Sequence, residues 1–553
     1  MSLAAVYQTE DAQRGATLSA MIDRQEIRAK VYPVTRKQAQ ALAKECATAA
    51  RESQEDTGAL HAMCDRWRIE YPASDYGRHC EVARLTDAGW WARKIRPADW
   101  RQYETQQLRL GNVTHYVSDE IAKARQWHRA AIRQQLENLF LIRDDHQAII
   151  TMAQASDAGT ANPAIRRAEM IVRAKGLARW RAAQGFTWTF VTITAPSKYH
   201  RMRTVNGKQV QNGKWDGATP RETQKYLCAV WARIRAALQR SAVEWSCFRT
   251  VEPHADGTPH WHLCLFVLPE NLPAVRAIFR KHALAEDGTE PGADLHRCTF
   301  EDYAGPADDA AAVADRCIAY LIAYVSKNID GDRVSGGSAR DTDNEGQRID
   351  IGAATESAAR VEAWATLWGI RQFAVLGGSQ AVSAYRELRR LREAVPDSDV
   401  EAVRAPADGA DYCAFIEQAR QRDLELWTQT TRQRLIVEAA HLDINGREAS
   451  PALAELATEK NLFNKYGEPV RRWIFGIVAD GKRWLTREHA WTCTDAAGVE
   501  RIAADKAAAA YFRKVGETMA ADRLHWPDAV DSLLALAPGF LFLRAPPARA
   551  LDS

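Results

Sequence analysis

The chain has 553 residues, of which 46% are apolar and 26% charged, and this composition excludes a disordered, collagen-like or disulfide-rich protein. At roughly 150 residues per domain, the length favours three or four domains. No run approaches the roughly 18 consecutive apolar residues of a membrane span, and the ten cysteines form no CxxC pair. We therefore expect a cytoplasmic protein with reduced thiols and no membrane association.

The net charge of +3 is unevenly distributed along the chain. Residues 166–240 carry 16 Lys or Arg against three acidic residues, a local net of +13, whereas residues 281–350 carry 7 basic and 15 acidic residues. A basic segment of this size is typical of polyanion binding. Taken alone, it is explained equally well as a solvated helix face.

The first part of the chain, residues 1–164, is rich in Ala, Arg, Gln and Glu and is predicted to be mainly helical. Residues 186–196 then alternate like a strand and end at a proline. A Thr-Pro start followed by helical periodicity predicts a helix over 220–240. Its predicted apolar stripe consists of Leu227, Val230, Trp231, Ile234 and Leu238.

A hairpin is predicted next along the chain. Two strand-like runs, 247–252 and 260–268, flank the turn-rich segment 253–259, whose Asp-Gly centre is a strong hairpin signal. Helices are predicted around 271–285 and 311–328. These elements suggest an α+β domain over this part of the chain.

The remaining chain divides into three predicted parts. Residues 331–355 are rich in Gly, Asp and Ser and suggest a flexible linker, residues 356–399 suggest a helical extension, and residues 400–553 suggest a separate C-terminal region. A second hairpin is predicted over 471–494, turning at Asp480–Gly481. The chain contains no GxxxxGK[ST] phosphate loop, so no ATPase motor is expected within it.

The predicted hairpin carries a candidate metal site. His260 and His262 share one face of a strand, while Trp261 points to the opposite face, which we expect to be buried. Glu252 on the preceding strand can lie beside the two histidines. Two imidazoles and a carboxylate leave coordination positions open for water and a phosphate oxygen, as a catalytic metal requires. His254 shares strand parity with Glu252 but falls in the turn, so it is a weaker candidate ligand.

Tyr320, Tyr324 and Lys327 are spaced i, i+4 and i+7, so on a helix they form one polar stripe. A tyrosine hydroxyl has a pKa of about 10, so it needs a nearby base or cation to attack a phosphodiester. Lys327 can supply that positive charge. The apolar residues of the other faces, which would anchor the helix to a sheet, are Ile318, Leu321, Ile322 and Val325.

Three runs in this order, FVTIT (190–194), HWH (260–262) and YLIAYVSK (320–327), resemble the motifs of the HUH rolling-circle replication endonucleases. The two-tyrosine form is similar to the bacteriophage replication gene A protein family of peduovirus-type phages. The resemblance covers about 165–395. Further runs that support it are 225–238, 252–262 and 364–373.

The resemblance implies an HUH endonuclease domain over 165–330, with a central antiparallel sheet flanked by helices and mainly helical terminal regions. It implies that His260, His262 and Glu252 hold Mg²⁺ or Mn²⁺. Tyr320 and Tyr324 match the two nucleophiles, and Lys327 matches the lysine that follows them. The residues predicted to track the DNA backbone are Arg166, Arg167, Arg173, Lys175, Arg179 and Arg181.

The implied function is a replication initiation endonuclease that acts in the cytoplasm of a bacterial host. It would nick single-stranded origin DNA through a 5′-phosphotyrosyl intermediate, leave a free 3′-OH for rolling-circle replication, and rejoin the strands. The host helicase and polymerase are the expected partners. Three alternatives stay open: a two-tyrosine HUH transposase, a non-catalytic origin-binding protein, and a structural zinc module.

Overall fold

The computed structural model describes residues 33–113, 115–143, 148–205, 208–302, 311–318, 329, 341–342, 348–349, 354–377, 382–429, 433–434, 457–458, 464–468, 473–487 and 491–504. The chain divides into two compact units, residues 1–130 with 158–488 and residues 131–157 with 489–553. Most of the linker expected at 331–355 lies outside the described residues. None of the described helices is long and apolar enough to cross a membrane.

The first unit begins with a helical bundle, as the composition of this region predicts. Its helices are α3 (Arg36–Glu52), α4 (Thr57–Arg66), α5 (Arg78–Leu85) and α6 (Ala88–Leu110), and α7 (Asp119–Glu137) follows them. Side-chain caps start three of these helices: Thr35 forms a capping box at α3, and Asp56 and Asp87 accept backbone N–H bonds at α4 and α6. The bundle has its own apolar core, which includes Trp91 and Ile95.

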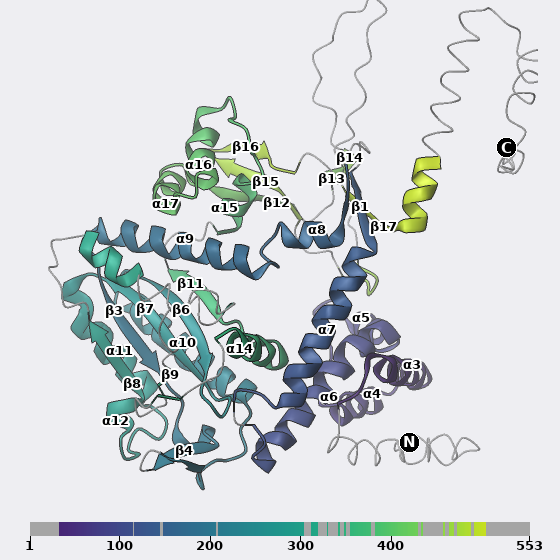
Figure 1. Ribbon diagram of the computed structural model, residues 1–553, viewed down its shortest axis with the longest axis horizontal. Coiled ribbons are helices and arrows are strands. Elements are labelled where there is room, and N and C mark those ends of the chain that lie inside the picture. The colour runs from purple at the N-terminus through teal and green to yellow at the C-terminus, as the bar shows by residue number, and fades with distance from the viewer. Residues whose placement is uncertain are drawn as a thin grey trace, which may run out of the picture. The chain divides into compact units, whose positions relative to one another are not determined.

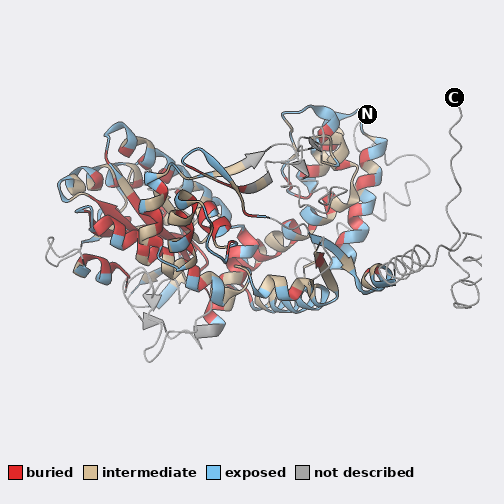
Figure 2. Ribbon diagram, turned by 90° about the horizontal axis from the view of Figure 1, so that it is seen from above, coloured by how far each residue is buried: buried red, intermediate tan, exposed pale blue. Residues whose placement is uncertain are grey.

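A five-stranded antiparallel sheet forms the centre of the first unit (Figure 1). Its strands are β3 (Thr187–Ile193), β6 (Trp245–Pro253), β7 (Pro259–Val267), β8 (Cys298–Asp302) and β11 (Phe373–Gly377). They run in the order β11-β6-β7-β3-β8, so β7 with its two histidines is the middle strand. Buried residues are concentrated in this sheet and in the helices that face it (Figure 2). The protein is therefore α+β, as predicted.

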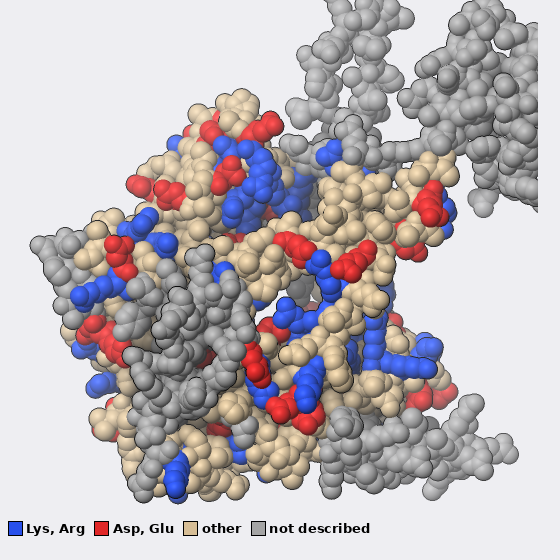
Figure 3. All heavy atoms as spheres, viewed as in Figure 1, with Lys and Arg blue, Asp and Glu red and all other residues tan. Residues whose placement is uncertain are grey.

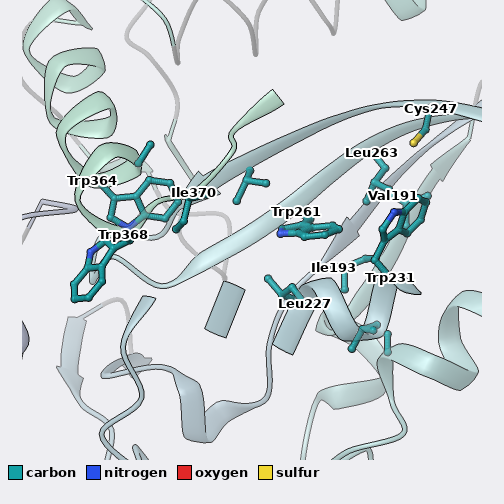
Figure 4. Close-up of a cluster of buried hydrophobic side chains, with 14 of the residues drawn as sticks. Val191, Ile193, Leu227, Trp231, Cys247, Trp261, Leu263, Trp364, Trp368 and Ile370 are labelled. Carbon is teal, nitrogen blue, oxygen red and sulfur yellow. The ribbon is translucent and has the colours of Figure 1, made fainter. Parts of the chain in front are cut away.

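One face of the sheet packs against α10 (Pro220–Arg240), α11 (Leu272–Ala283) and α14 (Ala354–Trp368). The sequence starts α10 with Pro220 at N1 and a capping box between Thr219 and Glu222. All five residues of the predicted stripe on α10 are buried, which confirms that prediction. Trp261 of β7 lies in this core close to Leu227 and Trp231 (Figure 4).

The other face packs against α9 (Pro163–Ala182) and a helical segment at 311–318. A C-terminal module completes this core, so the described residues from 400 to 487 pack with α9 and the sheet. Gly176 of α9 shows how closely the module approaches, because a Cβ there would lie 2.5 Å from Cβ of Tyr412. The elements of the module are α15 (Val382–Leu388), α16 (Ser398–Asp408), α17 (Tyr412–Gln421), β12 (Glu425–Gln429), β15 (Trp473–Ala479) and β16 (Lys482–Leu485).

Two local predictions in this half of the chain have different outcomes. The hairpin turning at Asp480–Gly481 is confirmed, and both turn residues have the positive φ of a type I′ turn, +47° and +72°. The helical extension over 356–399 is only partly right, because β11 interrupts it and adds an edge strand beside β6. Gly369 ends α14 with a left-handed φ of +67°, and the β-rich run after it then joins the sheet.

A two-stranded ribbon, β4 (Met202–Val205) and β5 (Lys208–Gln211), extends from the first unit beside the sheet (Figure 1). The remaining short elements of the unit are η1 (Ser197–Tyr199), η2 (Pro269–Asn271), α12 (Ala293–His296), β9 (Asp341–Thr342), β10 (Arg348–Ile349), β13 (Gln433–Arg434) and β14 (Ala457–Thr458).

The second unit contains a small antiparallel sheet of order β17-β1-β2. Its elements are β1 (Leu139–Arg143), β2 (Ile149–Thr151), α8 (Met152–Asp157) and β17 (Trp491–Asp495). Arg133 forms ion pairs with Glu137 at 2.9 Å and with Asp157 at 2.7 Å, which ties the last turns of α7 to α8. None of the predicted site residues lies in this unit.

Candidate functional site

The β6–β7 hairpin carries the two histidines and their predicted carboxylate partner. Glu252 of β6 is the register partner of His260 of β7, so the two side chains lie side by side on one face. His262 shares that face, whereas Trp261 is only 1% exposed on the other. The predicted turn joins the strands, with Gly257 at φ +85°. The structure therefore confirms the prediction that His260 and His262 share one face of the strand and that Trp261 lies on the other.

Glu252, His260 and His262 bring one ligand atom each within 4.8 Å of one another, and theirs is the one such group among the described His, Cys, Asp and Glu residues. Nε2 of His262 is 3.9 Å from Oε2 of Glu252. Two atoms bound to one ion at about 2.1 Å each are at most about 4.2 Å apart, so this separation is compatible with a shared ion. The donor set of two imidazoles and a carboxylate thus fits a divalent cation.

A hydrogen bond from β3 orients one of these histidines. Oγ1 of Thr192 lies 3.0 Å from Nδ1 of His262, its register partner across the β3–β7 ladder. The ring also stacks on Phe190, with centroids 5.4 Å apart. Engaging Nδ1 leaves Nε2 directed toward Glu252, which is the usual way in which a partner outside the ligand set fixes a metal-binding histidine. Sequence reasoning missed Thr192, although its place in the FVTIT run was a signal.

His254 is not among the three grouped ligands, but its ring stacks on that of His260 with centroids 4.0 Å apart. The ring of His200 packs edge-on against that of His254, with the two centroids 5.2 Å apart. Burial opposes the charged form of Asp256, yet the imidazoles of His200 and His254 and two backbone N–H groups hold the pKa of that carboxyl below its usual value. The turn is thus a polar, buried support for the strand that carries His260.

The predicted nucleophiles Tyr320 and Tyr324 and the predicted Lys327 lie outside the described residues. The residues on either side of them are described. Ile318 and Ile329 are both buried in the core on the histidine face of the sheet.

The helical segment 311–318 also contacts that face directly. Trp188 of β3 donates a hydrogen bond from Nε1 to the carbonyl of Val313 at 2.9 Å. Sγ of Cys317 lies 2.9 Å from Sγ of Cys264, which is two residues beyond His262 on β7. The chain therefore enters the predicted tyrosine segment from the same side of the sheet as the three candidate ligands.

The basic residues predicted to contact DNA occupy α9 but are used in different ways. Arg181 is 1% exposed, and its guanidinium donates to Ser246 Oγ at 2.9 Å and to Glu244 Oε1 at 2.7 Å. The side chain of Arg181 is therefore part of the packing between α9 and β6, which leaves it almost no surface for the predicted DNA contact. Arg173 is also buried and lies 3.5 Å from a carboxylate oxygen of Glu169.

The other members of the set differ in exposure. Arg167 is buried, Arg166 and Lys175 are half-buried, and Arg179 is exposed. Burial therefore removes Arg167 and Arg173 from the surface as well, and a DNA backbone could reach only Arg166, Lys175 and Arg179 of this set. The net charge of the segment does not distinguish the buried arginines from the exposed cations, because burial depends on how α9 packs against the rest of the protein.

The fold and the site define an α+β protein with a candidate two-histidine, one-carboxylate metal site on the middle strand of an antiparallel sheet. The family model of the bacteriophage replication gene A protein (GPA) matches residues 13–332. This is more than half of the chain, which therefore belongs to that family.

Relatives of known name agree with this assignment. The chain is 37% identical over 319 residues to the replication gene A protein of Escherichia phage 186, covering 56% of this chain and 43% of the relative. It is 34% identical over 343 residues to the replication protein of Haemophilus phage HP1, covering 61% and 41%. It is 32% identical over 355 residues to a probable replication endonuclease from a prophage-like region of Salmonella typhi, covering 61% and 42%. The match thus spans less than half the length of these relatives. No solved structure matches the chain significantly.

Proposed function

We propose that this protein is a replication initiation endonuclease with an HUH core, which nicks single-stranded origin DNA and later rejoins it. The observation that carries the proposal is the group formed by Glu252, His260 and His262, on the face of the sheet against which residues 311–318 pack. The names of the relatives, replication gene A protein and probable replication endonuclease, support the same activity.

The three grouped residues would hold Mg²⁺ or Mn²⁺. The ion would act as a Lewis acid at the scissile phosphate and offset the charge that develops on its oxygens. Thr192 orients the ring of His262, and the stacked ring of His254 supports that of His260. The chain thus fixes the imidazole positions before a substrate arrives, which lowers the cost of ordering them during the reaction.

Tyr320 or Tyr324 would act as the nucleophile. Its phenolate oxygen forms a bond to phosphorus while the bond from phosphorus to the 3′ oxygen breaks, which gives a 5′-phosphotyrosyl ester and, after protonation, a free 3′-OH. Lys327 would favour the phenolate by its positive charge. The ester keeps the phosphodiester energy, so rejoining needs no ATP. With a second tyrosine, the regenerated origin can be cleaved while the first ester is resealed.

The strand would lie along the exposed side of α9, with Arg166, Lys175 and Arg179 neutralising its phosphates. A host helicase would separate the duplex, and a host polymerase would extend the 3′-OH. In this proposal the protein works in the cytoplasm of a bacterial host. The free 3′-OH is what makes rolling-circle synthesis possible.

A covalent-adduct assay tests the proposal. The full chain is incubated with Mn²⁺ and single-stranded oligonucleotides that tile the encoding replicon, and products are resolved on denaturing gels and mapped by mass spectrometry. We expect a metal-dependent adduct on Tyr320 or Tyr324, partial activity in each single Tyr→Phe variant, and none in the double variant. An adduct in the double variant would move the nucleophile elsewhere. No adduct on any oligonucleotide, with DNA binding intact, would replace the proposal by a non-catalytic origin-binding protein.

A further inference from the structure

The β4–β5 ribbon is an exposed element that the proposed chemistry does not use. None of its described side chains is fully buried, and even Val205 is 40% exposed. Residues 201–215 include four cations and no carboxylate. In Figure 3, Lys and Arg atoms lie at the edge of the molecule where Figure 1 places β4. An isolated two-stranded hairpin is marginally stable in water, so this ribbon needs contacts with the rest of the protein to keep its structure.

The base of the ribbon is held by buried polar groups. Arg201 is buried and donates from Nη2 to the carbonyl of Val113 at 2.5 Å. Asn212 is buried directly after β5, where its backbone N–H donates to the carbonyl of Arg201 at 2.8 Å. Its side-chain amide donates to the carbonyls of Ser197 at 2.8 Å and His200 at 2.9 Å. The ribbon is therefore fixed at its root and exposed along its length.

The root is joined to the hairpin that carries the candidate ligands. The backbone N–H of Met202 donates to Oδ2 of Asp256 at 3.1 Å, and Oγ1 of Thr258 donates to the carbonyl of Tyr199. Asp256 and Thr258 lie in the turn between Glu252 and His260. A nucleic acid bound along the ribbon would therefore begin next to the candidate nicking site.

The two faces of the ribbon differ in chemistry. The register pairs Thr204 with Gln209, so these two side chains share one face, and Gln211 follows on the same side. Nε2 of Gln209 lies 2.8 Å from Oγ1 of Thr204 across the strands. Arg203 and Lys208 project from the other face, and both are exposed. One face thus offers two amides and a hydroxyl beside Met202, and the other offers two cations beside Val205 and Val210.

We propose that the β4–β5 ribbon binds duplex DNA that flanks the nick site. The major groove admits a two-stranded β-ribbon, and glutamine side chains can pair with the adenine edge there. Arg203 and Lys208 would contact phosphates, which add affinity without reading sequence. The proposal rests on the proposed endonuclease function, and it adds a second DNA contact: single-stranded DNA at the metal face and duplex DNA at the ribbon.

Duplex binding by paired variants tests the ribbon. Fluorescein-labelled 30-base-pair duplexes that tile the encoding replicon, and scrambled duplexes, are titrated with full chain and followed by anisotropy at several salt concentrations. We expect Q209A/Q211A to reduce the preference for the best tile over the scrambled duplex by about tenfold or more. We expect R203A/K208A to weaken both duplexes alike and to reduce the salt slope by about 2.

The matched control is R235A/R240A, which removes two exposed cations from the C-terminal half of α10, outside the ribbon. It should bind duplexes as the wild type does. Ribbon variants that bind and discriminate like the wild type would overturn the proposal, as would a wild type that prefers no tile. Thermal melts of all variants check the fold. The adduct assay on single-stranded DNA is run on the wild type in parallel, so its failure would remove the endonuclease and leave the duplex result standing.

Discussion

The two faces of β7 put consecutive residues of one strand to different uses. On one face, His260 and His262 lie beside Glu252 and engage polar partners. On the other, Trp261 is packed against Trp231 and donates a hydrogen bond to Gln224 at 2.9 Å. A middle strand is buried on both sides, so burial alone does not separate chemistry from packing. The two faces differ instead in the kind of side chain they carry. Substitutions on the histidine face should therefore reduce cleavage, and substitutions on the tryptophan face should reduce stability.

The largest expected effect is on cleavage, from the histidine face. H260A should reduce adduct formation by about 10³-fold or more, because a Lewis acid supplies several kcal/mol at the transition state and each 1.4 kcal/mol is a factor of ten. Salt-dependent binding of single-stranded DNA should persist. H282A, a histidine of α11 on the other side of the sheet, is the control and should cleave normally. Full cleavage by H260A would remove His260 from the site.

The opposite face should fail in stability instead. W261A should lower the free energy of unfolding by about 3–5 kcal/mol, since removing a buried aromatic side chain loses its burial and leaves a cavity. Urea unfolding measures this. The matched control is W127A, because Trp127 is 75% exposed on α7 and its loss should change stability by less than about 0.5 kcal/mol. Equal effects of the two substitutions would contradict the packing assigned to Trp261.

Local rules explain which parts of this arrangement the sequence could predict. The alternation at His260–His262, the capped helix α10 and the turn at Asp480–Gly481 depend on neighbours within a few residues, so their pattern is visible in the chain. The fate of Arg181 depends on Ser246 and Glu244, more than 60 residues away, and the place of α17 depends on a close approach at Gly176. Such contacts leave no local pattern. The ligand roles and the two tyrosines stay predictions.

Arg181 and Arg179 of α9 extend the comparison to the helix that covers the histidine face. Arg181 has a packing role, whereas Arg179 is exposed. R181M removes three charge-assisted hydrogen bonds, to Ser246, Gln184 and Glu244. It should cost about 1.5–3 kcal/mol in unfolding while leaving the salt slope of single-stranded DNA binding unchanged. R179M removes an exposed cation, so it should cost less than about 0.5 kcal/mol and lower that slope by about 0.7. The reverse pattern would mean that Arg181, not Arg179, reaches the DNA.

The smallest expected effect comes from a residue that supports a ligand without binding the metal. T192V removes the hydroxyl that engages Nδ1 of His262, so the ring loses a fixed orientation and Mn²⁺ affinity should fall by about tenfold. T192S keeps the hydroxyl and should restore the affinity. The matched control is T189V on the same strand, because Thr189 faces the other core and its hydroxyl has no hydrogen-bond partner among the described residues.

Calorimetric titration with Mn²⁺ measures these differences without any DNA, so the result does not depend on cleavage. An affinity lost in T192V and regained in T192S assigns the effect to one hydrogen bond rather than to the shape of the side chain. If T192V and T189V weaken Mn²⁺ binding equally, the loss comes from packing in β3, and the orientation of His262 by Thr192 has no role in the site. That outcome would mean that only the ligands on β6 and β7 determine metal binding and that the neighbouring strand β3 contributes packing alone.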